Sequence, residues 1–508
     1  MSNKPLLIGY HTNINRGFDK RPDFDYPAKN GKGVDFILCH FDPGKEKLQE
    51  QCKKAEDGAK LLKELGVDFI ANFEEQNFQY DCVTEDGYDW ASHGEGVHRL
   101  CVPKEYIDVL TSEGNCLGIM YDEFEHVIIN RNTSLKLASK GKIDLPVFPT
   151  SKNKDFKTQY ELLSKQLKEY ADGLKEKGAA TVSGEHVFPV MFHLFARNGI
   201  IPNFKSQKES VSNVQFAIAA GAALQYKTEL WNCVDMWYRM TFPGHSANEM
   251  KNNLVFAYLT GVDRVYVESS HCFFDKDNKY NEIGKAFTDF ADEYKGKERN
   301  YNVLDYKPEI GIIRCDDTFW GQGGIVPVWR YILFGNPKIK PDKKAKEYIK
   351  AFHTITHRET SKSTLSWDSA RPFFLTKHRS FVSMNGAAVF DETVSGDVLN
   401  SLKLCFLCGY YISEDTFENI KKLVKENGLT AVVPKRFAPE HIKSKISGSF
   451  CEIKDGNGVW IVTENPASKK LQKRLEKFTG KKGEMAYRFG ENTVKMKIAK
   501  NGETFDII

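Results

Sequence analysis

Three carboxyl groups and one imidazole lie within five residues of the chain: Asp122, Glu123, Glu125 and His126. The apolar segment 116–121 before them has the length of a buried strand and follows a turn at residues 112–115. In barrels and open α/β sheets, substrates bind at the carboxyl ends of the strands. The pattern therefore predicts a catalytic rim, and a solvated acidic loop after a core strand is the alternative.

Strands and helices alternate along the first 300 residues, as they do in a parallel sheet. The predicted strands are residues 6–10, 34–39, 67–73, 116–121, 200–205, 224–233, 263–268 and 309–314. Helical periodicity covers residues 44–65, 103–110, 155–177, 185–197, 214–222, 247–260 and 283–294, with a capping box at Ser246 and Glu249. Eight strands predict a (β/α)8 TIM barrel, but 34–39 could be a hairpin arm and 309–314 could begin another domain.

The remainder of the chain predicts two smaller units. Short apolar strands around 385–391, 402–407, 428–434 and 459–462, with a surface helix at 413–425, suit a flavodoxin-like α/β sheet. Alternating residues near 493–498 predict a small β module. We therefore expect a catalytic barrel at 1–306, an α/β domain at 307–465 and a C-terminal β module at 466–508.

Composition limits the classes of protein. The 508 residues carry 72 basic and 68 acidic side chains, a net charge of +4, and no sustained basic stripe, so we expect no nucleic-acid partner. No apolar run reaches membrane-spanning length, and the amino terminus lacks a secretory pattern, which predicts a cytoplasmic protein. The eleven cysteines are scattered, and Cys405 and Cys408 lie in an apolar strand pattern, so we interpret them as structural thiols.

A barrel with acids at its strand ends, a glutamine-amidotransferase-like α/β unit and a small β tail together resemble the family 42 β-galactosidases and related clan A glycoside hydrolases. Residues 402–434 look like that family's trimerisation domain, which implies a homo-oligomer. In the family an acid/base glutamate ends strand four and a nucleophile ends strand seven, so the resemblance implies Glu123 and Glu268. Clan A enzymes usually have Asn where this chain has Asp122. If the strand count shifts by one, Glu229 or Asp235 replaces Glu268.

Glycoside hydrolysis needs two carboxyl groups across the scissile bond, one of which holds a raised pKa. Like charges at Asp122, Glu123 and Glu125 would raise one of these, with Glu125 the alternative acid. Aromatic rings stack on sugars. The expected substrate-binding residues are Asp122, Glu125, His126, Trp231, Asp235, Trp237, Lys205 and His11, where Lys205 could meet an anionic sugar.

The sequence thus predicts an exo-acting, retaining glycoside hydrolase with no metal or cofactor and a carbohydrate as its substrate. Three alternatives stay open: an inverting glycosidase, a non-catalytic carbohydrate-binding protein, and a metal-dependent barrel hydrolase. The last would hold its cation with His126, Asp122 and Glu125, together with His11 or Glu268.

Overall fold

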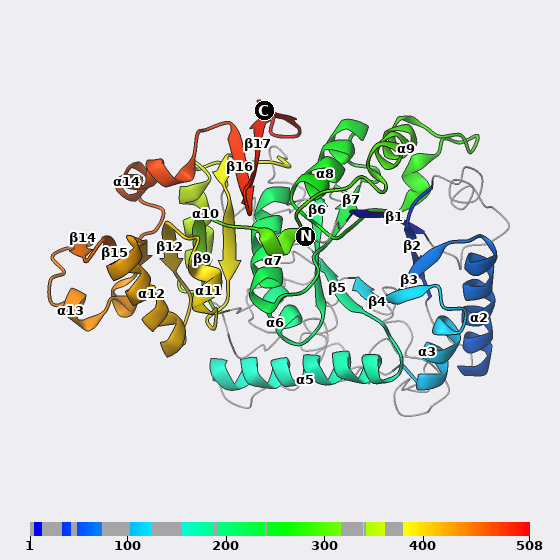
Figure 1. The fold of residues 1–508 in the computed structure, drawn as a ribbon, viewed down its shortest axis with the longest axis horizontal. Helices are drawn as coiled ribbons and strands as arrows, with labels where there is room; N and C mark the ends of the chain where they lie inside the picture. Colours follow the sequence, from blue (N-terminus) through cyan, green and yellow to red (C-terminus); the bar gives the residue numbers. More distant parts are fainter. Residues whose placement is uncertain are drawn as a thin grey trace, which may run out of the picture.

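The computed structural model describes residues 5–12, 33–41, 48–73, 102–122, 155–186, 191–208, 210–238, 241–315, 339, 342–360 and 379–508. Eight parallel strands follow one another around a closed barrel, whose last strand pairs with its first (Figure 1). They are β1 (Leu7–Thr12), β2 (Phe36–His40), β3 (Asp68–Asn72), β4 (Cys116–Asp122), β5 (Val182–His186), β6 (Ile201–Gln207), β7 (Trp231–Asp235) and β8 (Arg264–Glu268). The predicted TIM barrel is confirmed.

Helices alternate with the strands and cover the outside of the barrel. They are α2 (Leu48–Glu64), α3 (Lys104–Thr111), α5 (Phe156–Glu176), α6 (Phe192–Arg197), α7 (Ser212–Tyr226), α8 (Ala247–Leu259) and α9 (Glu282–Tyr294), with short 3-10 helices η4 (Ser270–Phe273) and η5 (Val303–Asp305). The capping box predicted for α8 is present: Ser246 Oγ accepts from Glu249 N at 3.2 Å, and Glu249 Oε2 accepts from Ser246 N at 3.0 Å.

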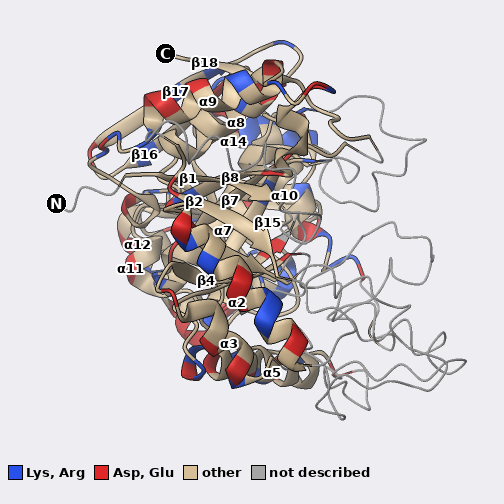
Figure 2. Ribbon diagram, turned by 90° about the vertical axis from the view of Figure 1, so that its right-hand side faces the viewer, with Lys and Arg blue, Asp and Glu red and all other residues tan. Residues whose placement is uncertain are grey.

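Opposite charges alternate along the outer helices α2, α3 and α5 (Figure 2). Lys60 and Glu56 approach to 2.5 Å, and Lys168 and Asp172 to 2.8 Å, in both cases one helical turn apart. Exposed pairs of this kind stabilise a helix by only a few tenths of a kcal/mol, so these faces are ordinary solvated surface. None of the helices in the described part of the chain has the length and apolar character needed to cross a membrane.

Two of the predicted elements are wrong. Residues 185–197 are not one helix, because β5 ends at His186 and α6 begins only at Phe192. β5 lacks an apolar run because Glu185 belongs to the polar rim described below, and outward Gly184 lies so close to Phe195 that a Cβ there would be 2.8 Å from its ring. Residues 309–314, counted as the eighth strand, contain β9 (Ile310–Ile313), which belongs to another sheet.

The interior of the barrel has an apolar floor beneath a polar rim. Its floor is a separate buried cluster of inward side chains: Phe36, Leu38, Ile70, Met120, Ile201, Trp231, Cys233 and Tyr266. Side chains two apart on a strand share a face. The inward residues that follow the floor are therefore His40, Asn72, Asp122, Asp235 and Glu268, each two residues beyond a floor residue. The packed floor leaves chemistry only to the carboxyl ends of the strands.

A six-stranded sheet lies beside the barrel, in the order β11-β9-β12-β13-β15-β14. These strands are β11 (Ala387–Phe390), β12 (Leu404–Leu407), β13 (Thr430–Val433), β15 (Gly458–Thr463) and β14 (Phe450–Asp455), of which only β14 is antiparallel to its neighbour. Because β9 lies between β11 and β12, the chain moves first to one side and then to the other, as in flavodoxin-like sheets.

The helices of this part are α10 (Glu347–Ile355), α11 (Gly396–Leu399), α12 (Glu414–Asn427), η9 (Lys435–Phe437), α13 (Glu440–Lys443) and α14 (Lys469–Thr479). Cys405 and Cys408 are buried, and burial raises the pKa of both thiols, so neither is an activated nucleophile. A third sheet contains β10 (Met384–Asn385), β16 (Glu484–Phe489), β17 (Asn492–Ile498) and β18 (Phe505–Ile507). The domain boundaries after residues 306 and 465, and the amidotransferase likeness, stay predictions.

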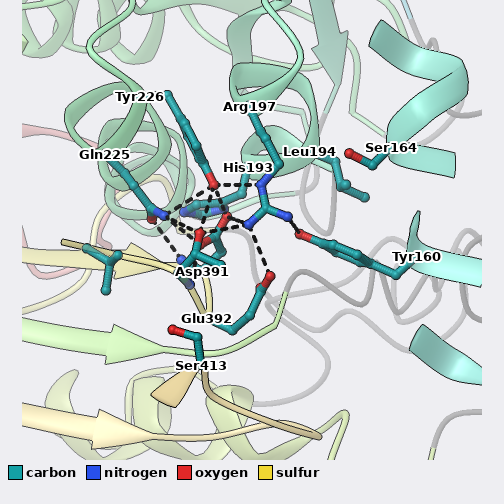
Figure 3. Close-up of polar contacts among 12 residues, drawn as sticks. Tyr160, Ser164, His193, Leu194, Arg197, Gln225, Tyr226, Asp391, Glu392 and Ser413 are labelled. Carbon is teal, nitrogen blue, oxygen red and sulfur yellow. Dashed lines mark hydrogen bonds and ion pairs between the residues drawn. The ribbon is translucent and has the colours of Figure 1, made fainter. Parts of the chain in front are cut away.

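A buried polar network joins the barrel helices to the six-stranded sheet (Figure 3). Arg197, at the end of α6, donates from Nη2 to Asp391 Oδ2 and to Glu392 Oε1, both at 3.0 Å. Tyr226, at the end of α7, receives Arg197 Nε at 2.8 Å and donates to the same Asp391 carboxylate. Helix α7 also lies directly against β11, because a Cβ on Gly221 would fall 1.6 Å from the Val389 carbonyl oxygen.

Gly221→Ala should therefore lower the free energy of unfolding by about 3 kcal/mol or more, because helix or sheet must move to admit the methyl group. Gly173→Ala is the matched control: a Cβ there meets nothing within 4 Å in helix α5, so we expect about 0.5–1 kcal/mol of stabilisation. Urea unfolding of both variants measures this difference. Equal stability would show that α7 is not held against β11.

Candidate active site

Every strand of the barrel contributes one polar side chain to the rim at its carboxyl end. We define the mouth ring as these eight inward residues: His11, His40, Asn72, Asp122, Glu185, Lys205, Asp235 and Glu268. All are buried, and Glu268, at 7% exposed, is the most accessible of the four acids. Because the strands are parallel and in register, side chains as far apart in sequence as those of His11 and Glu268 meet at one end of the barrel.

Lys205 lies at the centre of the ring and contacts four carboxyl groups from four strands. Its Nζ is 2.6 Å from Glu268 Oε2 and 2.9 Å from Glu185 Oε1. The same nitrogen is 3.2 Å from Asp122 Oδ1 and 3.4 Å from Asp235 Oδ2. Burial alone would lower the pKa of Lys205, but the four acids raise it well above its ordinary value. Lys205 is therefore a permanent buried cation.

The carboxyl groups around Lys205 have pKa values shifted in opposite directions. Burial, helped by the Asp235 charge, raises the pKa of Glu268 to about 8. Burial and Asp122 also raise the pKa of Glu185 well above its ordinary value. Burial would raise the pKa of Asp235 too, but Lys208 and Lys205 outweigh it and lower that pKa. At neutral pH, Asp235 is therefore ionised while Glu268 holds a proton.

Contacts below and beside the ring fix these carboxyl groups in place. Asp235 Oδ1 accepts from the Trp237 backbone N–H at 2.8 Å, and its Oδ2 lies 3.3 Å from Lys208 Nζ. Tyr266, from the floor, donates its hydroxyl to Glu185 and itself accepts from Asn203 Nδ2 at 2.8 Å. Such contacts hold the acids in one geometry.

The other half of the ring contains no carboxyl group and no lysine. The rings of His11 and His40 stack with their centroids 4.4 Å apart, and Asn72 pairs in register with His40. Burial, followed by the charges of His40 and Lys205, lowers the pKa of His11 well below its ordinary value. His11 is therefore a neutral imidazole at pH 7. We call the part of the ring on β1 to β3 the neutral half, because it contains no carboxyl group and no lysine, in contrast to the charged half on β4 to β8.

Most of the described residues predicted for the site come together. Five lie in the mouth ring (His11, Asp122, Lys205, Asp235 and Glu268), and Trp237 lies two residues after Asp235. Trp231 does not join them: it is fully buried in the floor at the amino end of β7, where its indole donates to Glu229 Oε2 at 2.7 Å. Glu123, Glu125 and His126 lie outside the described residues.

The strand numbers behind the predicted roles need correction. Because β5 went unpredicted, Glu268 was expected at the end of strand seven, but it ends β8, and Asp235 ends β7. The sequence reasoning also missed Glu185, His40, Asn72 and Lys208. Glu185 ends the unpredicted strand, so only a reading of 182–186 as a short polar strand could have found it.

The charged half offers a cation position that a side chain already fills. Ligand atoms of Glu185, Cys233 and Glu268 lie within 4.8 Å of one another, which is close enough to hold a metal ion. The Lys205 ammonium, however, contacts both carboxyl groups at 2.9 Å and 2.6 Å. These residues therefore do not fit a divalent metal while Lys205 is present.

No family model and no curated protein matches the chain. Among solved structures, it is similar to the catalytic module of a family 98 glycoside hydrolase from Streptococcus pneumoniae, with 11% identity over 98% of this chain and 75% of that one, at a TM-score of 0.45. It is also similar to a family 42 exo-carrageenase from Bacteroides ovatus, with 9% identity over 97% and 72% of the chains and a TM-score of 0.40. A family 5 glycoside hydrolase from Bifidobacterium longum subsp. longum has 12% identity over 61% and 82%, and a TM-score of 0.39. All three are glycoside hydrolases, the class that the sequence resembles.

Lys205→Met should lower the free energy of unfolding at pH 7 by about 3–5 kcal/mol, because four buried acids lose the cation that contacts them all. The deficit should narrow as pH falls and the carboxyl groups are protonated. Lys165→Met, at an exposed side chain with 77% accessibility, is the control and should change stability by less than about 0.5 kcal/mol. Denaturant unfolding at several pH values measures both. A Lys205→Met protein as stable as the control would contradict the central role of Lys205.

Proposed function

We propose that this protein is a glycoside hydrolase whose reaction takes place at the mouth ring. The observation that carries the proposal is the pair Asp235 and Glu268, which are register neighbours on β7 and β8 with pKa values shifted in opposite directions. Carboxyl groups that differ in this way supply an acid and an ionised partner at the same pH. Cleavage of a glycosidic bond needs both.

In this proposal Glu268 is the general acid, which donates its proton to the glycosidic oxygen of the leaving group. Its pKa of about 8 keeps it protonated at neutral pH, and its carboxyl group is the most accessible of the four around Lys205. Asp235 keeps its negative charge and stabilises the positive charge that develops on the sugar ring in the transition state. Lys205 and Lys208 act as positioning residues, because they hold the acids together and set their pKa values.

The sequence supplies the second catalytic carboxyl group of the proposal. Glu123 directly follows Asp122, whose carboxyl group contacts Lys205 at 3.2 Å, and it lies outside the described residues. The resemblance implied Glu123 as the acid/base and Glu268 as the nucleophile. Because Glu268 holds the proton in this proposal, we propose Glu123 as the nucleophile instead. Glu123→Gln should then reduce the rate as strongly as a change at Glu268. If the enzyme retains the anomeric configuration, the two carboxyl groups work at the short spacing of about 5 Å. Proton NMR of the first-formed sugar tests this: an inverted product would reject the retaining course and leave hydrolysis intact.

An aromatic surface beside the acids also supports a carbohydrate substrate. Trp237 is only partly buried, and its ring packs on Phe242 with centroids 4.9 Å apart, which makes a firm aromatic surface beside Asp235.

A covalent role for Lys205, by contrast, would need a neutral amine, and the four acids keep this amine charged. Exo action, cytoplasmic location and association of copies are further proposals from the sequence.

Glu268→Gln and Asp235→Asn should each reduce kcat/KM on the best aryl glycoside by about 100-fold to 10,000-fold, since each removes one member of the acid and ion pair. Glu229→Gln is the matched control: Glu229 contacts Trp231 and Arg264 at the opposite end of the barrel, so its activity should stay near that of the wild type. Initial rates for the three variants test this. Full activity in both mouth variants would reject the proposed function.

The pH profile gives an independent check. The wild-type kcat/KM should fall as pH rises through about 8, because Glu268 then loses its proton. The Lys208 ammonium favours the ionised forms of both Asp235 and Glu268. Lys208→Met should therefore raise both pKa values and move both limbs of the profile to higher pH. Rates between about pH 4 and pH 10 measure the shift, and an unmoved alkaline limb would mean that Glu268 is not the titrating acid.

A further inference from the structure

A set of buried polar groups at the mouth has no hydrogen-bond partner. Within the described residues, four buried side chains have no partner for any of their polar atoms and take part in no ion pair: His11, Asn72, Gln207 and Ser270. We name them the unpartnered set. They are between 0% and 5% exposed. All four lie at or within two residues of the carboxyl end of a barrel strand, namely β1, β3, β6 and β8.

Such groups are costly unless something binds them. A buried amide or imidazole loses its hydrogen bonds to water on folding, so proteins satisfy nearly all groups of this kind. Elsewhere in the described structure, buried amides do find partners: Asn253 Nδ2 donates to Glu249 O at 2.9 Å, and Asn203 Nδ2 donates to Tyr266. The concentration of the unpartnered set at one end of the barrel indicates a ligand with several hydroxyl groups.

The geometry of the neutral half fits one sugar ring. His11, His40 and Asn72 lie on three adjacent strands, so the row spans about 10 Å, twice the distance between neighbouring strands. A neutral imidazole has one donor and one acceptor, and the Asn72 amide has both kinds of atom. Neighbouring hydroxyl groups on a sugar present the same alternation of donors and acceptors.

The charges in the mouth select against an acidic sugar. Lys205 is held by four carboxyl groups, and Lys208 contacts Asp235 at 3.3 Å, so each of these two cations already has an acidic partner. Neither cation is therefore left to pair with an anionic sugar. An uncharged sugar would satisfy the unpartnered set without bringing a further charge into the barrel.

We propose that His11 and Asn72 bind hydroxyl groups of an uncharged sugar residue and so position it against the charged half of the mouth ring. This proposal rests on the proposed function and adds its substrate class and two positioning residues. It departs from the expectation that Lys205 would meet an anionic sugar.

The test uses variants in which binding and stability should change in opposite directions. His11→Phe keeps a ring to stack on His40, and Asn72→Leu keeps the volume of the amide. Each should raise KM for a neutral aryl glycoside by about 10-fold to 100-fold with a smaller change in kcat, because a hydroxyl loses its partner. The Tm of each should stay level or rise, since no protein hydrogen bond is lost.

Asn253→Leu is the matched control in helix α8. It removes a buried amide that does have a protein partner, so its Tm should fall while KM stays unchanged. A lower Tm with an unchanged KM in His11→Phe and Asn72→Leu would show that these residues are structural and would overturn the proposal. A preference of the wild-type protein for uronide over neutral glycosides would also overturn it.

Direct binding separates this proposal from the proposed function. Calorimetric titration of the wild-type protein with galactose, glucose, mannose, xylose and galacturonate should show binding of at least one neutral sugar, weakened at least about tenfold in Asn72→Leu. Binding of this kind with no hydrolysis would sink the proposed function and keep the hydroxyl-binding role. Hydrolysis that depends on Glu268 but not on His11 or Asn72 would overturn the hydroxyl-binding role and keep the proposed function.

Discussion

The contact of one buried ammonium with four carboxyl groups is the interaction on which the rest of the site depends. Burying the Lys205 ammonium alone would cost a large desolvation free energy. Burying the carboxyl groups of Asp122, Glu185, Asp235 and Glu268 alone would be costly too, but their contacts with Lys205 offset these costs. The contact also divides protons unequally among the acids, which is the property that hydrolytic chemistry needs. It exists only because four different strands end at the same height of one closed barrel.

The floor and the neutral half determine which surroundings the charged cluster has on its other sides. Apolar side chains such as Met120 and Ile70 fill the barrel below the rim, so the charges cannot relax inward. Tyr266 joins the two layers, since its ring packs in the floor while its hydroxyl bonds to Glu185. On the opposite side, His11 and His40 present stacked imidazole rings. The barrel interior is therefore filled by apolar side chains below the rim, whereas the rim itself is lined by charged side chains on one side and by imidazole and amide side chains on the other.

The second sheet contacts the barrel through the neighbouring helices α6 and α7. Lys205 lies on β6, and the helix that follows, α7, packs its Gly221 directly against the backbone of β11. The network of Arg197, Tyr226 and Asp391 fastens the same junction, and burial together with Asp391 raises the pKa of Glu392 to about 7. The α/β unit thus supports the side of the barrel that carries the central cation, whatever else it binds.

The amino-acid sequence by itself determined the alternation of strands and helices, the capping box at Ser246, and the presence of acids at the ends of β4, β7 and β8, because periodicity and local hydrogen bonds are properties of neighbouring residues. It did not reveal β5, whose polar and glycine residues make sense only against Phe195 and Lys205. It also placed Trp231 at the rim, since a strand's residues do not say which end of the barrel they occupy. Only the tertiary structure decided that Lys205 is the centre, that Asp235 and Glu268 are neighbours, and that Asn72 and Glu185 belong to the site, because these contacts join residues far apart in the chain and arise from the closure of the barrel.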